Sequence, residues 1–289
     1  HTRQVAYLPF ISSFHPTMLT NCINEVSSNS DINAELLDIP NEILAHLFKC
    51  LRRYDRFSVS QSCNRLYEVI HNHVGYKRIN IPAYEATSHC SRLCGSPLLK
   101  NTNISVQSPS DSDLSMLSGV LHLTLKFRTK SILLTDDGLK SICGVHHLSL
   151  KNCHSITDTG LMPLVAHLQS IHLYGVPNLT SELIKTFAGI PHISIPNSSA
   201  TDEVLVALSG VISLDIQKCK LITDAGVSAL AGVHTINLSG TKVTDKGVLS
   251  LVGVHNIKLC GCKHITGESM KYLAGVHSIN LSRTNATDD

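Results

Sequence analysis

Histidine is the residue type in this sequence that most invites a chemical interpretation. The chain contains 17 histidines, and four of them, His146, His234, His255 and His277, occupy the same position of a recurring Gly-Val-His string. If the segments carrying the last three form adjacent strands, their imidazoles stack about 4.8 Å apart. Such a row could bind a metal ion or respond to pH. Because each histidine belongs to a string that is repeated whole, we favour a structural role at the start of a strand.

Two further clusters have the spacing of metal ligands. Cys260-x-Cys262-x-His264 is one of them, but alternation along a strand would turn Cys260 outward while Cys262 lies in the following turn. The second combines His89-Cys90 with Cys94, in a segment without clear periodicity. Neither arrangement predicts convergent ligands, so we expect no metal site and no cofactor.

Catalytic signatures are not found in the sequence. There is no phosphate-binding loop, no nucleophile elbow and no HExxH pair. Serine, histidine and aspartate are plentiful, yet they fall at repeated positions that strands and helix caps explain. A hydrolase would need three such side chains to converge, which a regular repeat disfavours. We therefore expect a protein without catalytic residues of its own.

The elements that position these residues are repeats. The strings GVHTINLSGTKVTDKG, GVHNIKLCGCKHITGE and GVHSINLSRTNATDD follow one another, beginning at Gly232, Gly253 and Gly275. A period in the low twenties with leucine-type spacing is typical of a leucine-rich-repeat solenoid, which is an α/β fold. Earlier units begin at Gly75, Gly119, Gly144, His167, Gly189 and Gly210. KNTNISV from Lys100 is a candidate for one more unit, and residues 82–118 are either degenerate repeats or an insertion.

Each position of the repeat has a physical interpretation. In the unit from Gly232, we expect Val233, Ile236 and Leu238 to point into the core, and Thr235 and Asn237 to face the other side of the sheet. A small residue fills the ninth position, where a tight turn needs a partner for its buried backbone. These residues are Cys153, Cys219, Cys262, Thr241 and Thr284.

A Thr-Asp step precedes each expected helix. Threonine is a good N-cap and aspartate suits the positive end of the helix dipole. The step occurs at Thr157-Asp158, Thr201-Asp202, Thr223-Asp224, Thr244-Asp245 and Thr287-Asp288. Apolar triplets at helical spacing are expected to cover the sheet. They are Val227, Leu230 and Ala231, then Val248, Leu251 and Val252.

Composition narrows the possible partners. Aliphatic residues dominate, with 43% hydrophobic but only 4% aromatic residues, and the net charge is +2. That charge is too small to argue for nucleic acid or an anionic membrane. No apolar run is long enough to span a membrane. The ten cysteines form no evident disulfide framework, which favours reduced thiols and a cytoplasmic or nuclear location.

A different pattern occupies residues 36–71. Pro40 suits the first position of a helix, and Ile43, Leu44, Leu47, Phe48 and Leu51 then form an amphipathic stripe. Two more apolar sets follow, up to Ile70. We expect three short helices, too few to bury much surface without a partner or the adjoining repeats.

This segment resembles an F-box. The family's opening Leu-Pro-x-Glu-Ile-Leu is matched by Ile39 to Leu44, its later Ile-Phe and Leu by Leu47-Phe48 and Leu51, and its Val-Cys by Ser62-Cys63. The repeats resemble the cysteine-containing class of leucine-rich repeats through Ile-Thr-Asp-x-Gly at Ile156 and Ile222. An F-box followed by such repeats is the layout of substrate receptors of SCF-type ubiquitin ligases.

The resemblance implies two kinds of partner. The F-box of that family binds a Skp-type adaptor, and through it a cullin, while the repeats bind a protein substrate. By resemblance, the adaptor-binding residues are Ile39, Pro40, Glu42, Ile43, Leu44, Leu47, Phe48 and Leu51. An alternative is that this segment only caps the solenoid of a non-catalytic binding scaffold.

The outward strand positions define the candidate substrate surface. Its selected residues are His122, Lys126, His147, Lys151, His172, Tyr174, Asp215, Asn237 and Lys258. The N-terminal part is basic and rich in histidine, and the C-terminal part is small and neutral. We hypothesise that an acidic or phosphorylated partner would lie over Lys126, Lys151, His172 and Tyr174. The alternative is a solvated surface without a ligand.

The expected organisation is therefore threefold. Residues 1–35 are polar and predicted to be flexible, residues 36–71 form the F-box-like module, and residues 75–289 form the repeats. The final repeat stops at Thr287-Asp288, where a further helix would begin.

Overall fold

The computed structural model describes residues 78–83, 86–94, 98–101, 103–128 and 133–286. All the predicted adaptor-binding residues, from Ile39 to Leu51, lie outside these ranges, as does Thr287-Asp288. From Ile79 onward the described residues belong to one compact unit.

Ten strands form a single sheet in sequence order. The strands are β1 Arg78–Ile81, β2 Asn103–Gln107, β3 His122–Lys126, β4 His147–Lys151, β5 Ser170–Tyr174, β6 His192–Ser194, β7 Ser213–Asp215, β8 Thr235–Asn237, β9 Asn256–Lys258 and β10 Ser278–Asn280. From β2 to β10 every neighbouring pair is parallel. Asn103–Gln107, which contains the NISV part of the KNTNISV segment, pairs in register with β3 as the strands of the later repeats pair with one another.

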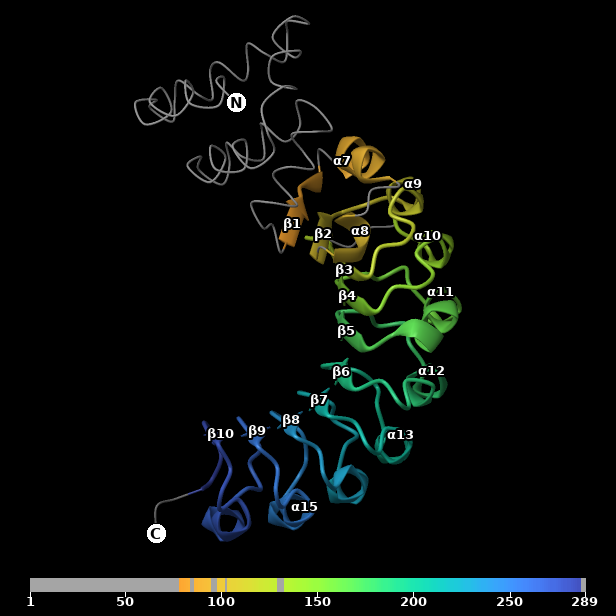
Figure 1. Ribbon diagram of the computed structural model, residues 1–289. Helices are drawn as coiled ribbons and strands as arrows, with labels where there is room; N and C mark the ends of the chain where they lie inside the picture. The colour runs from red at the N-terminus through yellow and green to blue at the C-terminus, as the bar shows by residue number, and fades with distance from the viewer. Residues whose placement is uncertain (1–77, 84–85, 95–97, 102, 129–132, 287–289) are drawn as a thin grey trace, which may run out of the picture. The chain divides into compact units, whose positions relative to one another are not determined.

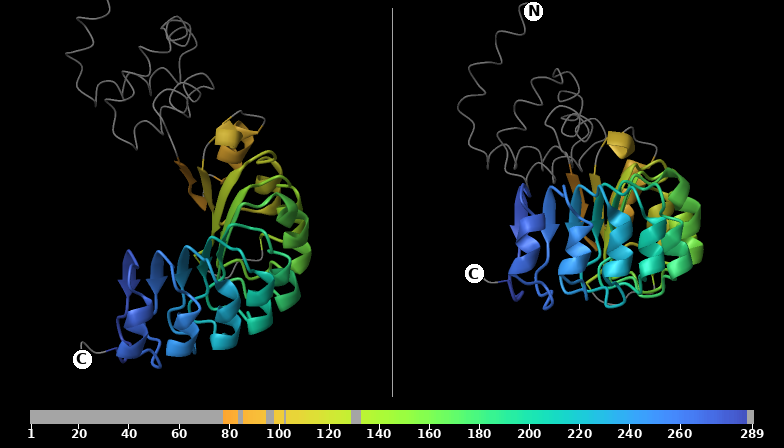
Figure 2. Two further views of the ribbon diagram at one scale, coloured as in Figure 1. Left: turned by 60° about the horizontal axis from the view of Figure 1, so that its bottom comes forward. Right: turned by 90° about the horizontal axis from the view of Figure 1, so that it is seen from below.

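Short helices connect the strands and lie on the outer side of the curved sheet, and none of the described helices covers its inner side (Figure 1, Figure 2). The α-helices are α7 Ala86–Leu93, α8 Leu98–Asn101, α9 Asp111–Ser115, α10 Asp136–Lys140, α11 Asp158–Leu161, α12 Ser181–Lys185, α13 Asp202–Ala207, α14 Asp224–Val227 and α15 Asp245–Leu249. The 3-10 helices are η2 Met162–His167, η3 Ser228–Leu230 and η4 Gly267–Tyr272. In the part of the chain that the structure describes, no helix has the length and apolarity needed to cross a lipid bilayer.

The core follows the predicted alternation. Val233, Ile236 and Leu238 are at most 3% exposed, and so are Val254, Ile257 and Leu259 of the next repeat. Burying such side chains is worth about 1.5–3 kcal/mol each, and this is the main stabilising term of the solenoid. Gly232 joins the helix to the strand with a φ of 85°, a conformation that glycine adopts without steric strain.

The predicted helical triplets are correct only in part. Val227, Leu230, Val248 and Leu251 are buried, but Ala231 is exposed and Val252 is 63% exposed. The physical reason is the shortness of the helices. Ala231 already has an extended ψ of 132°. α15 ends at Leu249, and the turn that follows, in which the Leu251 N–H donates to the Val248 carbonyl, keeps Leu251 buried but leaves Val252 outside.

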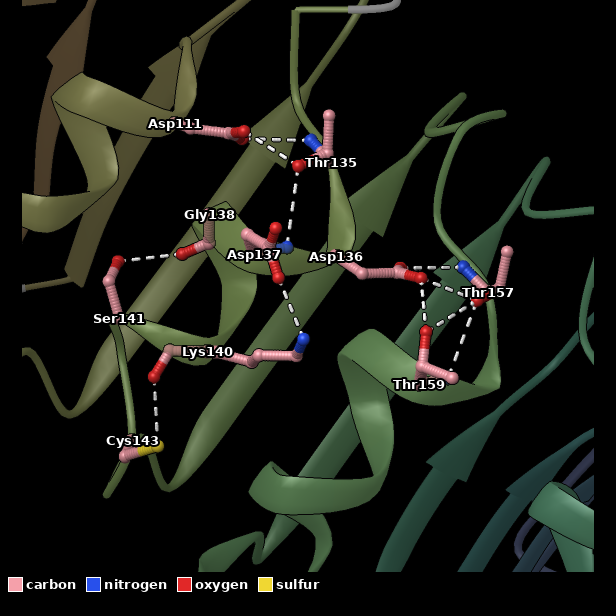
Figure 3. Close-up of polar contacts among 10 residues, drawn as sticks. All are labelled: Asp111, Thr135, Asp136, Asp137, Gly138, Lys140, Ser141, Cys143, Thr157 and Thr159. Atoms are coloured by element: carbon pink, nitrogen blue, oxygen red, sulfur yellow. Dashed lines mark hydrogen bonds and ion pairs between the residues drawn. The ribbon is translucent and has the colours of Figure 1, made fainter.

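The Thr-Asp step connects consecutive repeats (Figure 3). Thr157 is the N-cap of α11, as predicted. Its backbone N–H and its hydroxyl both donate to the carboxylate of Asp136, one repeat earlier, over 2.8 and 2.5 Å. Thr159 donates a third hydrogen bond to the same carboxylate. Asp136 was not among the predicted steps, and its carboxylate fastens its own helix, α10, to the next one, α11.

The same Asp-to-Thr clamp recurs along the described repeats. The pairs are Asp111–Thr135, Asp136–Thr157, Asp158–Thr180, Asp202–Thr223, Asp224–Thr244 and Asp245–Thr266. The predicted cap Thr201 makes no capping hydrogen bond through its side chain. The preceding helix, α12, begins with Ser181 rather than aspartate, so this repeat offers no carboxylate at the clamp position.

Candidate functional site

The open inner face of the sheet, called the concave face from here on, carries the predicted substrate residues. The register aligns them in rows: His122 with His147, Lys126 with Lys151 and Tyr174, and Asp215 with Asn237 and Lys258. Adjacent strands are about 4.8 Å apart, so in-register side chains are close neighbours. Two other outward positions, Thr124 and Ser170, are at most 9% exposed and offer little surface.

A stacked histidine pair begins the first row. The ring centroids of His122 and His147 are 4.3 Å apart, with an interplanar angle of 5°. Partial burial lowers the pKa of His147, and the nearby His122, His146, His192 and His172 lower it further. His147 is therefore a neutral hydrogen-bonding group at physiological pH.

His172 has a similar character on β5. Loss of solvent lowers the pKa of His172, His192 adds to this lowering, and the carboxylate of Asp215 opposes it. The ring nevertheless lies at the surface, where it lines the hollows of the concave face described below. His172 thus offers a neutral donor and acceptor to a ligand.

Lysine and tyrosine meet at the carboxyl end of the strands. Lys151 places its ammonium 5.6 Å from the centroid of the Tyr174 ring, a cation–π arrangement. Lys126 lies beside Lys151 in the register, and Tyr174 is 51% exposed. Arg128, exposed and two residues after Lys126, adds a third cation. Arg128 lies just beyond the end of β3, so the alternation of residues within the strands did not predict it.

The described residues of the concave face line two shallow hollows. The first, of about 220 Å³, lies over β2 to β5, and its polar lining consists of Asn103, His122, Thr124, His147, Ser149, Ser170 and His172. The second, of about 240 Å³, lies over β5 to β10 and includes Asp215, Asn237 and Lys258. Asp215 accepts a hydrogen bond from the backbone N–H of Gln217 over 3.1 Å. The two hollows together involve all the predicted substrate residues except Lys126, Lys151 and Tyr174.

The histidine ladder at the start of the strands forms as predicted. His234, His255 and His277 stack with centroid separations of 4.7 Å in both steps, against the expected spacing of about 4.8 Å. Stacked rings direct their nitrogen lone pairs sideways rather than toward a common point. Among the described residues no group of three or more His, Cys, Asp or Glu side chains could hold a metal ion.

The cysteines of the ninth position serve the turns. Cys262 is fully buried and its thiol donates to the carbonyl of Leu238, one repeat earlier, over 3.1 Å. Cys260 is partly exposed, so the predicted separation of these two residues is confirmed. Burial raises the pKa of Cys153 to about 12, which keeps this thiol protonated and unreactive.

The Cys90 environment does not favour a metal ligand either. Cys90 is fully buried in α7, and burial, together with the charge of Asp113, raises its pKa to about 12. A zinc ligand would have to be the thiolate. Cys94 is exposed.

Comparison with known proteins supports both halves of the sequence interpretation. Residues 36–82 match the F-box-like family, so the resemblance noted for residues 36–71 is confirmed at this level. Residues 145–165, 211–231 and 233–252 match the family described as Leucine Rich repeat. No curated protein matches the chain significantly in sequence.

Solved structures with similar folds share little sequence with the chain. A chain in the crystal structure of the yeast Rad7 and Elc1 complex is 13% identical with a TM-score of 0.53, covering 94% of this chain and 95% of that one. A chain of the Toll–Spatzle complex of Drosophila is 12% identical with a TM-score of 0.50, and the match covers 73% of this chain and 38% of that one. The internalin InlF of Listeria monocytogenes is 20% identical with a TM-score of 0.49, and the match covers 68% of this chain and 59% of that one.

At these identities the first two structures support the fold alone. Combined with the family matches and the ten-stranded parallel sheet, they lead to one conclusion. The chain consists of an N-terminal F-box-like region followed by an α/β leucine-rich-repeat solenoid. This combination is suited to binding other proteins.

Proposed function

We propose that the chain is the substrate-recognition subunit of a cullin–RING ubiquitin ligase of the SCF type. The observation that carries this proposal is the F-box-like match at residues 36–82, directly followed by a solenoid whose concave face is not covered by any described helix. In this proposal the F-box binds a Skp-type adaptor, which connects to a cullin, and the concave face binds a protein substrate.

The chain would contribute proximity rather than chemistry. Holding a substrate near the ubiquitin carrier raises the effective concentration of its lysines, which is a recognised source of rate enhancement. The stacked His234, His255 and His277 and the buried Cys262 thiol bonded to Leu238 have structural explanations. We therefore propose no catalytic role for the chain and a cytoplasmic or nuclear location, where the ligase and reduced thiols coexist.

Adaptor binding is the test of this function. The full chain, residues 1–289, is co-expressed with a tagged Skp adaptor, beside the double variant Ile43→Asp, Leu47→Asp. We expect a stable complex with the unaltered chain and at least about a tenfold loss of retained chain with the variant, because buried charges disrupt an apolar interface. The readout is the amount of chain retained on the tagged adaptor.

Two controls make the result specific. Val252→Asp places a single negative charge on a residue that is 63% exposed in the solenoid, and it should leave the complex intact. Elc1, the partner in the similar yeast structure, is tested in parallel as a second adaptor. A folded chain that binds neither adaptor would contradict the proposal and leave a binding scaffold whose N-terminal segment is a cap.

A further inference from the structure

The charges of the concave face are unevenly distributed. Among the strand residues that the structure describes on this face, Asp215 of β7 is the single carboxylate. Lys126 and Lys151 lie on β3 and β4, and Lys258 lies on β9. The strands from β3 to β5 therefore form a basic region, and a ligand bound there meets no negative side chain from these strands.

Lys126 and Lys151 are placed to act on one anionic group. They occupy the same position of adjacent parallel strands, which are about 4.8 Å apart. Both side chains therefore leave the same face of the sheet from neighbouring points, and a long lysine side chain at each point can reach one carboxylate or phosphate bound above the strands. Arg128 is exposed two residues further along the chain.

Tyr174 adds an ordered apolar platform to this basic region. The cation–π contact between Lys151 and the ring restrains a flexible side chain, so less entropy is lost when a ligand binds. The ring is 51% exposed, and exposed tyrosines of this kind are frequent energetic centres of protein interfaces.

The first hollow continues the same surface. Among its polar lining residues, His122, His147 and His172 are imidazoles and Ser149 is a hydroxyl, and all of them can donate hydrogen bonds to oxygen. In contrast, the second hollow contains both Asp215 and Lys258, so its charges offset each other. Among the described strand residues of this face, the positive charge that no carboxylate offsets therefore lies on β3 and β4.

We propose that the surface formed by Lys126, Arg128, Lys151 and Tyr174, with the hollow over β2 to β5 beside it, binds an acidic peptide segment of a protein substrate. The anionic group that the two lysines share is a carboxylate or a phosphate. This inference rests on the proposed function in that the peptide belongs to the substrate.

A peptide fits this surface better than nucleic acid does. Sequence-independent binding of single strands combines a long basic groove with several aromatic rings that stack on bases. Here the basic region covers three strands, Tyr174 is the exposed tyrosine on them, and the net charge of the chain is +2. One short anionic segment matches that extent of charge.

The test measures binding of defined probes to the full chain by fluorescence anisotropy. The probes are fluorescein-labelled poly-glutamate, a phosphoserine-containing Gly-Ser peptide, the unphosphorylated Gly-Ser peptide and single-stranded oligo-dT. We expect one or both anionic peptides to bind with an affinity that falls as salt rises, and we expect no binding of the neutral peptide. The stronger anionic probe identifies the group as carboxylate or phosphate.

Matched variants locate the site. The double variant Lys126→Glu, Lys151→Glu should bind the anionic peptide with an affinity at least about tenfold lower. Lys246→Glu with Lys263→Glu makes the same change in net charge at exposed lysines outside the strands and should change the affinity less than about twofold. Tyr174→Ala should also weaken binding, because it removes the platform without changing the charge.

Three outcomes overturn the inference. They are absence of binding by both anionic peptides, equal weakening by the two lysine pairs, and oligo-dT binding as tightly as the peptides. The lysine variants are also tested for adaptor capture. If the adaptor is captured but no peptide binds, this inference fails while the proposed function stands. Peptide binding without adaptor capture would instead reject the ligase proposal.

Discussion

Replacing Gly226 with alanine is expected to destabilise the solenoid by about 2 kcal/mol or more. Gly226 is the third residue of α14, and it is buried against the preceding repeat. An added Cβ would collide with Oδ1 of Asp202 and would lie 2.8 Å from the Cα atom of the same residue. Because one of these atoms belongs to the backbone, a change of rotamer cannot relieve the contact.

The sign of this effect distinguishes the packing explanation from helix propensity. In an exposed helix interior, glycine to alanine stabilises by about 1 kcal/mol. Urea denaturation of Gly226→Ala should instead show a lower midpoint. Lys246→Ala, at an exposed helical position one residue before the equivalent Gly247, is the control and should change stability by less than about 0.5 kcal/mol. A Gly226→Ala variant as stable as the unaltered chain would refute the close packing.

Replacing Asp136 with alanine is expected to lower the free energy of unfolding by about 2 kcal/mol at neutral pH. The carboxylate accepts hydrogen bonds from the N–H and hydroxyl of Thr157 and from the hydroxyl of Thr159. Hydrogen bonds to a charged group contribute about 1.5–3 kcal/mol each when they are buried. The sum is smaller here because the site is only partly buried. The measurement is the free energy of unfolding from urea titration.

The effect should depend on pH in a defined direction. Burial by itself raises the pKa of Asp136, but the hydrogen bonds from Thr157 and Thr159 and the charge of Lys140 outweigh it, so the net pKa is lowered. A carboxyl with a lowered folded-state pKa stabilises above its unfolded pKa and loses this contribution as pH falls through the folded value. The difference between the unaltered chain and Asp136→Ala should therefore shrink below about pH 4.

Asp137→Ala is the matched control for this prediction. Asp137 is the next residue of the same helix, its side chain is 85% exposed, and it forms a 2.7 Å ion pair with Lys140. Exposed pairs of this kind contribute at most about 1 kcal/mol. Equal destabilisation by Asp136→Ala and Asp137→Ala would mean that the clamp between repeats does not stabilise the solenoid.

The clamp also shows where sequence reasoning reaches its limit. The Thr-Asp step is visible in the sequence, and Thr157 is the N-cap that was predicted. However, the partner of each aspartate lies in the next repeat, 21 residues away for Asp136 and Thr157. Only the stacking of the repeats brings these two residues together. The requirement for glycine at position 226 follows from the same contact and could not be derived from one repeat alone.

Features that depend on the repeat period were predictable. Ile236 and Leu238 are buried because strand alternation is a local property, and His234, His255 and His277 stack because equal spacing places them in register. The prediction that Val252 covers the sheet was wrong, because the sequence pattern does not show where so short a helix ends. Arg128 was missed because it lies just after its strand. The predicted contacts of Ile39 to Leu51 with an adaptor remain predictions.

The most direct test of the account asks whether one chain joins an adaptor to an acidic ligand. Immobilised Skp adaptor is incubated with the full chain and labelled anionic peptide, and the retained peptide is measured. We predict retention that depends on the chain and is lost with Ile43→Asp, Leu47→Asp. Lys126→Glu with Lys151→Glu should lose the peptide while the chain stays on the adaptor. A folded, peptide-binding chain that the adaptor does not retain would contradict the account.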